Sequence, residues 1–262
     1  MSKLHKKTIQ RYYSKRARNY DKQKSRTWKS ELGFEAKIIN EIVSAVSQAR
    51  NGLILEVGVG SGRVALSLMK ETPSRLIGLD LSREMLQSAQ MKMTSCKQKL
   101  NLLMGDAEHL PFCNNIFDTL ICISTFHYFS SPKIILEEFS RVLKEKGVFI
   151  YGDVTMHELD QDNFLDQLEK TISPAHAKYS RPLEMKKLLE SWEIQVKKME
   201  VIPYKKLYSA LIEDKAQYFN IKPQSLYEKL SKATKNEKNL YDIEEDQMTL
   251  FYTLIKGIKQ NF

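Results

Sequence analysis

The sequence predicts an α/β protein built on a mainly parallel β-sheet. Short apolar runs alternate with segments of helical periodicity through residues 53–152, and such alternation is typical of strands joined by helical crossovers. The first apolar run, at 53–57, leads into a glycine turn at 58–62, and the next run ends in Asp80. Strand, glycine turn, helix, strand and acid together are the plan of a nucleoside-binding crevice.

The expected elements follow in order along the chain. We expect strands near residues 53–57, 76–80, 101–105, 117–123 and 147–152. Helices are expected near residues 31–48, 62–70, 83–96 and 132–144, the last because its apolar side chains recur at helical spacing.

After residue 153 the pattern changes. A helix is expected from Arg181 to Trp192, followed by strands at 193–201 and 248–258, with a tyrosine-rich helical segment at 204–246 between them. We therefore predict three parts: a basic N-terminal lid segment, a core domain and a helical insertion. Their bounds are 1–30 for the first, 31–202 with 248–262 for the second, and 203–247 for the third. The insertion is either a stabilising cap or a wall of a substrate pocket.

The spacing of the glycines favours one kind of nucleoside. A dinucleotide fingerprint requires G-x-G-x-x-G/A, whereas this turn reads G-x-G-x-G and places Arg63 where the third small residue would be. Glu56 precedes the glycines, where a carboxylate would repel a diphosphate but could accept a hydrogen bond from an ammonium group. S-adenosylmethionine (SAM) has an ammonium group and no phosphate. An unliganded turn is the alternative.

Five motifs in this order carry a family resemblance. They are E-V-G-V-G-S-G at 56–62, L-D-L-S at 79–82, G-D-A-E-H-L-P-F at 105–112, F-D at 117–118 and R-V-L-K at 141–144. Together they resemble the class I SAM-dependent methyltransferases, and most closely the type 11 group with its ubiquinone/menaquinone C-methyltransferases. The resemblance covers about residues 10–155, and it departs from the family at Glu145-Lys146, a surface turn that is usually Pro-Gly.

The resemblance implies a Rossmann-like, seven-stranded sheet in the order 3-2-1-4-5-7-6, with strand 7 antiparallel, helices on both faces and a helical cap. It also implies SAM as cofactor and S-adenosylhomocysteine (SAH) as product. The glycine turn would hold the methionyl part, Asp80 the ribose hydroxyls, and Asp106 the adenine edge. The cofactor-binding residues implied are Tyr20, Glu56, Gly58, Gly60, Ser61, Gly62, Asp80, Leu81, Met85, Asp106, Ala107 and Ser124.

The catalytic residues are sought just after the fourth strand, at the sheet edge where ligands bind. His127 is the candidate base because the pKa of histidine is ordinarily near neutrality, and Tyr128 and Asp153 are second choices. The alternative is that His127 only packs. We expect no metal cluster, and we expect His176 to be exposed.

The positive charge of the chain is concentrated at its N-terminus. Residues 1–30 hold eleven Lys and Arg and one acid, a net +10, whereas the rest of the chain has a net charge of −1. This segment is a solvated helix face, an arm for RNA or acidic lipid, or a transit peptide. Because residues 12–21 resemble the family segment that folds over the cofactor, we favour a lid.

These features rank the possible functions. A SAM-dependent methyltransferase acting on a small molecule leads; a protein or RNA substrate docked by the basic N-terminus is the alternative, and a non-catalytic SAM-binding module is less favoured. The absence of a [DN]-P-P-[YF] motif after the fourth strand lowers the case for nucleic acid. The three cysteines have no C-x-x-C spacing, and we find neither an apolar run long enough for a membrane span nor a signal peptide, so a cytoplasmic location is expected.

Overall fold

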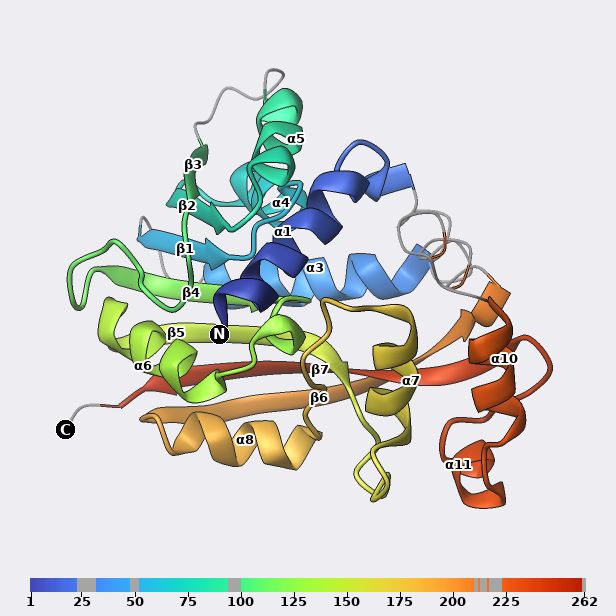
Figure 1. Cartoon of the computed structure of the whole chain (residues 1–262). Helices are drawn as coiled ribbons and strands as arrows, with labels where there is room; N and C mark the ends of the chain where they lie inside the picture. Colours follow the sequence, from blue (N-terminus) through green and yellow to red (C-terminus); the bar gives the residue numbers. More distant parts are fainter. Residues whose placement is uncertain are drawn as a thin grey trace.

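The computed structural model describes residues 1–22, 32–47, 52–93, 100–209, 212, 216 and 223–260. It contains a seven-stranded sheet in the order β3-β2-β1-β4-β5-β7-β6, which confirms the predicted fold (Figure 1). The strands are β1 (Leu53–Val57), β2 (Arg75–Asp80), β3 (Leu100–Met104), β4 (Phe117–Ile123), β5 (Leu143–Thr155), β6 (Ile194–Leu207) and β7 (Gln247–Lys259). Neighbouring strands are parallel except for β7, which is antiparallel to both β5 and β6.

Helices cover both faces of this sheet. They are α1 (Lys3–Arg16), α3 (Leu32–Ser47), α4 (Arg63–Glu71), α5 (Arg83–Met93), α6 (Pro132–Val142), α7 (Phe164–Ile172), α8 (Pro182–Glu190), α10 (Pro223–Ser231) and α11 (Lys235–Leu240), with a 3-10 turn η2 at Phe126–Tyr128. One core cluster contains residues of α3, α4 and α7, and a second contains residues of α6 and α8. Figure 1 shows α3 and α8 on opposite sides of the sheet.

The pleat of the strands sorts side chains between these two cores. Ile121 and Ile123 of β4 belong to the α3 and α4 core, whereas Leu120 and Cys122, which alternate with them, belong to the α6 and α8 core. Successive residues of a strand point to opposite faces, so the same alternation continues along β5 and β7. Tyr252 of β7 lies in the α3 and α4 core.

The part of the chain after α6 differs from the sequence prediction in three places. The segment expected to be helical from Tyr204 begins as strand, because β6 pairs with β7 as far as Leu207 and Gln247. Pro203 is tolerated in that strand because β6 is at the edge of the sheet. The sequence analysis did not predict α7, and β5 is longer than expected. The expected ends of the helix at 31–48, residues 23–30 and residues 94–96 lie outside the described residues.

No helix in the described part of the chain combines the length and the apolar character that crossing a membrane requires.

One lysine ties the C-terminal strand to the end of α6. Lys259 is 8% exposed, and its Nζ donates to the carbonyl oxygens of Ser140 at 2.7 Å and Leu143 at 3.0 Å and to Asn115 Oδ1 at 3.2 Å. The last carbonyls of a helix have no partner within the helix, so this ammonium satisfies groups that would otherwise be buried unpaired.

We predict that Lys259→Met lowers the free energy of unfolding by about 1–3 kcal/mol, because the apolar side chain leaves buried carbonyls without a donor. Urea denaturation followed by circular dichroism measures this change. Lys187→Met, at an exposed position of α8, is the control and should change stability by less than about 0.5 kcal/mol. Equal effects of the two substitutions would contradict this role of Lys259.

Candidate functional site

A cavity opens at the carboxyl ends of β1, β2 and β4. It encloses about 850 Å³ of space, its open mouth included. The structure brings together in its lining all the predicted cofactor-binding residues except Gly62: Tyr20, Glu56, Gly58, Gly60, Ser61, Asp80, Leu81, Met85, Asp106, Ala107 and Ser124. Of the three predicted catalytic residues, Tyr128 lines the cavity, whereas His127 and Asp153 do not.

The floor of the cavity is the glycine turn after β1. Gly58, Gly60 and Gly62 have φ angles of 75°, 55° and 80°, in the left-handed region that favours glycine. A Cβ atom on Gly58 would lie 2.2 Å from Thr125 Oγ1, so a side chain there would collide with the loop after β4. Gly62 does not line the cavity; it is the N-cap of α4, and its N–H donates to the carbonyl of Val59 at 2.9 Å.

Glu56 places a buried carboxyl group in this cavity. Glu56 is only 3% exposed, and its Oε2 has no hydrogen-bond partner among the described residues. Burial, with a smaller contribution from the charge of Asp80, raises the pKa of Glu56 to about 8, although a backbone N–H at Ala65 acts against this rise. An ammonium group is the ligand that would complete such a site.

Asp80 faces the cavity from the end of β2. Its Oδ2 accepts from the Gly60 N–H and its Oδ1 from the Ser82 N–H, each at 2.8 Å, so the carboxylate is held in one orientation. Burial raises the pKa of Asp80 to about 6, and these backbone hydrogen bonds limit the rise. The group is therefore mainly ionised at neutral pH and can accept hydrogen bonds from a pair of ribose hydroxyls.

Helix α1 lies over the cavity and is hydrogen-bonded to its rim. Gln10 Nε2 donates to the Leu81 carbonyl at 3.1 Å, and Tyr13 Oη donates to Tyr128 Oη at 2.7 Å. Met1, Ile9 and Tyr13 contribute to the lining. Below this helix, the Ser61 hydroxyl donates to Asp21 Oδ1 at 2.7 Å, which joins the N-terminal segment to the glycine turn.

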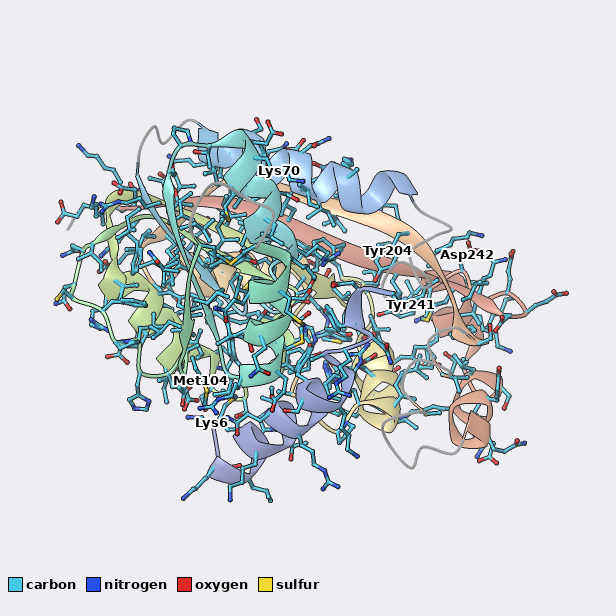
Figure 2. All side chains as sticks on the ribbon, turned by 90° about the horizontal axis from the view of Figure 1, so that it is seen from above. Lys6, Lys70, Met104, Tyr204, Tyr241 and Asp242 are labelled. Atoms are coloured by element: carbon cyan, nitrogen blue, oxygen red, sulfur yellow. The ribbon has the colours of Figure 1, made fainter. Side chains whose placement is uncertain are left out.

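An ion-pair cluster fixes the start of α1. Figure 2 shows Lys6 on α1, near Met104 at the end of β3; its Nζ donates to Asp106 Oδ2 at 2.5 Å and to Glu108 Oε2 at 2.6 Å. Burial opposes the charge of Lys6, but its hydrogen bonds to both carboxylates and the negative charges of these groups outweigh burial and raise the pKa of Lys6. The N-terminal ammonium of Met1 also pairs with Glu108. These carboxylates and His109 lie within metal-ligand distance of one another, but Lys6 holds both carboxylates.

Comparisons with known proteins agree with this geometry. The family profile described as Methyltransferase domain, of the type 11 group, matches residues 55–151. An uncharacterized protein of Methanocaldococcus jannaschii, MJ1123, is 30% identical over 180 residues, which are 68% of this chain and 77% of that protein. The chain belongs to the type 11 SAM-dependent methyltransferases.

Two further relatives bear on the fold and on the family. The demethylmenaquinone methyltransferase of Thermotoga maritima is 31% identical over 117 residues, 44% of this chain and 49% of that protein. The chain spans about half the length of several of the curated methyltransferases that it matches. The crystal structure of the YcgJ protein of Bacillus subtilis has the same fold, with a TM-score of 0.77 and 22% identity over 87% of this chain and all of that one.

The residues of this methyltransferase chain fit SAM. The unpartnered Glu56 oxygen would accept from the ammonium group, and Asp80 would accept from the ribose. The glycine turn would leave room for the methionyl part, because Gly60 places no side chain in the cavity. A Cβ at this position would come within 3.2 Å of Met85 Cε. Asp106 differs from the expected adenine partner in one respect: Lys6 already occupies its Oδ2.

His127 and Asp153 bond to each other away from the cavity of the methyltransferase. The His127 ring nitrogen Nδ1 lies 2.8 and 2.9 Å from the two carboxylate oxygens of Asp153, and the His127 backbone N–H donates to Oδ2 at 3.1 Å. Asp153 is 1% exposed. Their catalytic roles stay predictions. The expected exposure of His176 is wrong, because it is buried 5.7 Å from the His127 ring and bonded to Asp166.

Several lining residues were missed by the sequence analysis. Ile9 and Tyr13 come from α1, Met1 precedes that helix, and Thr125 and Phe129 flank η2. Ser124, which was predicted to bind the cofactor, has an unpredicted partner in Tyr252, with the two hydroxyl oxygens 3.2 Å apart. The residues around position 252 give no sign of this contact. The predicted cofactor-binding residues all precede residue 130, and only the pairing of β7 with β5 brings Tyr252 close to Ser124.

We predict that SAM binding at pH 7 releases about one proton. Glu56 is mainly protonated at that pH because its pKa is about 8, and it must ionise to pair with an ammonium group. The affinity for SAM should therefore rise between about pH 6 and pH 8. Calorimetry in buffers of different ionisation enthalpy measures the proton count.

Glu56→Gln should abolish this proton release and weaken binding, because the amide cannot ionise. Glu71→Gln, at an exposed position at the end of α4, is the matched control and should leave the proton count unchanged. Proton release that persists in Glu56→Gln would mean that another group receives the ammonium.

Proposed function

We propose that the chain transfers the methyl group of SAM to a small-molecule acceptor. The observation that carries this proposal is the buried Glu56 carboxyl, whose Oε2 has no hydrogen-bond partner among the described residues, in the same cavity under α1 as the oriented Asp80 carboxylate. When bound, SAM supplies a methyl group on a sulfonium, whose neutral leaving group needs neither a metal nor a covalent enzyme intermediate. The chain has to orient the acceptor and exclude water.

The enclosure of the cavity favours a small acceptor. Tyr13 of α1 closes against Tyr128 of η2, and Met1 and Ile9 add apolar walls. This cover narrows the approach to the cofactor, which favours a small acceptor over a folded macromolecule. Among the relatives, the Thermotoga maritima protein is named for a small molecule, demethylmenaquinone, which agrees with an acceptor of that size.

The outer face of α1 favours a second candidate. Lys3, Lys7 and Arg11 recur at every fourth residue and are exposed, and Arg18 is exposed after the helix. Such a row could dock an RNA or an acidic protein as the methyl acceptor. In that case methyl transfer to a macromolecular fraction should fall steeply with salt, whereas transfer to a small neutral or apolar acceptor should not.

The first test is cofactor binding. We predict that the chain binds SAM and SAH but not NAD, and that Asp80→Ala weakens SAM binding by about a hundredfold, because two hydrogen bonds to a charged group are lost. Calorimetry measures both, and Ser74→Ala, on the loop before β2, is a control outside the cavity. SAH formation is then assayed with small-molecule and macromolecular extracts. Binding of NAD without SAM would refute the proposal.

The second test concerns α1. We predict that deleting residues 1–17 leaves the sheet folded and weakens SAM binding by tenfold or more, because the helix supplies the cover of the cavity and few residues of the sheet core. Circular dichroism and calorimetry check the two parts. The double substitution Lys7→Gln, Arg11→Gln removes charge from the outer face and keeps the inner contacts, so it should change SAM affinity less than about twofold. Loss of affinity in the double variant alone would contradict a covering role.

A further inference from the structure

Helix α1 presents a one-sided charge to solvent on the face that is turned away from the cofactor cavity. Lys3, Lys7 and Arg11 are exposed and lie four positions apart, so they follow one stripe along a helix of 3.6 residues per turn. Arg18, just beyond the helix, is exposed as well. We call these four residues the basic row.

The acids near α1 do not neutralise the basic row. The helix itself contains no Asp or Glu. Glu84 of α5 accepts from the Ser14 hydroxyl at 2.5 Å, and Asp21 pairs with Lys92. Within the residues that the structure describes, no ion pair joins a member of the basic row to an acid. The row therefore faces solvent with its charge unbalanced.

This arrangement of charge opposes helix formation. Lys3 is in the first turn of α1, at the positive end of the helix dipole, and like charges four positions apart repel each other. A solvated helix face usually mixes both signs, as α8 does with Lys187 and Glu190. Folding alone does not account for the basic row, whereas a negatively charged surface beside it would remove the repulsion.

Two apolar side chains border the basic row. Leu4 is 76% exposed and Met91 is 68% exposed, the two largest exposed fractions among the exposed large apolar side chains of the described residues. Leu4 precedes Lys7 by three positions and so is its neighbour on the helix surface. Met91, on α5, lines the same surface groove as Arg18.

Bases interspersed with exposed apolar side chains suit the surface of an anionic bilayer. Lysine and arginine are attracted to the lipid phosphates, while leucine and methionine can enter the boundary between headgroups and acyl chains. Binding of RNA without sequence preference uses basic residues together with aromatic side chains on which bases stack. The aromatic side chains of α1 face inward, since Tyr12 is 1% exposed and Tyr13 lines the cofactor cavity.

We propose that the basic row, together with Leu4 and Met91, docks the chain on an anionic lipid surface. Such docking is independent of what the chain methylates and can be measured without an acceptor. Helix α1 carries the row on its outer face and the cover of the cofactor cavity on its inner face. Docking would therefore place the lipid beside that cover, on the side from which an apolar acceptor would arrive.

The first measurement tests the charge of the row. The full chain is sedimented with vesicles of phosphatidylcholine, with or without phosphatidylglycerol. We expect binding to be at least tenfold tighter with phosphatidylglycerol and to fall as salt rises from about 0.1 M to about 0.5 M. Lys7→Gln, Arg11→Gln should weaken this binding by tenfold or more, because each base near an anionic surface contributes about fivefold.

The matched charge control is Lys235→Gln, Lys238→Gln, which removes two exposed lysines from α11. It should weaken vesicle binding by less than about threefold, because Figure 1 shows α11 well away from α1. Circular dichroism and the affinity for SAH, which should change less than about twofold in every variant, check that the fold and the cofactor cavity are kept.

The second measurement tests the apolar contribution. Leu4→Gln should weaken binding to the phosphatidylglycerol vesicles by about threefold or more, because a polar side chain does not enter the acyl boundary. Leu183→Gln, at an exposed leucine at the start of α8, is the matched control and should leave binding unchanged. Single-stranded RNA and polyglutamate, measured in the same buffers, serve as anionic polymers with no acyl boundary.

The outcomes decide between a lipid surface and another polyanion. Selective binding to phosphatidylglycerol that is weakened both by Lys7→Gln, Arg11→Gln and by Leu4→Gln supports the proposal. Equal binding to the two kinds of vesicle, or a double variant that binds like the wild type, overturns it. If Leu4→Gln has no effect on vesicle binding while the double variant loses RNA or polyglutamate as strongly as vesicles, the row attracts any polyanion, and lipid docking is overturned.

Discussion

The site depends on a constraint of sheet topology. β1 has β2 on one side and β4 on the other, so the connections after β1 and after β4 leave the sheet in opposite directions. In a parallel sheet such a reversal of strand order leaves a crevice at the carboxyl ends of the strands, because the two adjacent loops run away from each other. Glu56 and the glycine turn line this crevice from β1, and Ser124 and Thr125 line it from β4.

Burial of an ionised carboxyl group in this crevice is unfavourable in the free protein, and pairing with a cationic ligand would offset that cost. Glu56 avoids it by remaining protonated, which its pKa of about 8 allows at neutral pH. Asp80, by contrast, is held as an anion by two backbone N–H groups. The two acids thus have different charge states, because both oxygens of Asp80 accept from backbone N–H groups, whereas Oε2 of Glu56 has no partner in the described part of the chain. A ligand with one ammonium and two neighbouring hydroxyls satisfies both.

The sequence predicted the parts of this site that are local along the chain. The strands at 53–57 and 117–123 match the prediction, and the glycine turn, Asp80 and Asp106 are each read from a few adjacent residues. Contacts between distant segments could not be predicted in this way. Lys6 meets Asp106 and Glu108 from about a hundred residues away, and the charge of residues 1–30 gave no sign that one lysine faces inward. The strand at 203–207 was missed because only pairing with β7 stabilises it.

The residues after β4 illustrate why proximity in the sequence is a poor guide to catalytic partnership. Ser124 and His127 are three positions apart, yet the 3-10 turn η2 directs them to different surroundings. Ser124 meets Tyr252 in the core beneath α3, and His127 meets Asp153, whose neighbour Tyr151 belongs to the core beneath α6 and α8. Because the pleat assigns adjacent positions of β5 to opposite faces, Gly152 lies beside Tyr252 whereas Asp153 points away from it. Ser124 therefore borders the cofactor cavity, whereas the His127–Asp153 pair fixes the loop that carries Tyr128 and, through it, α1.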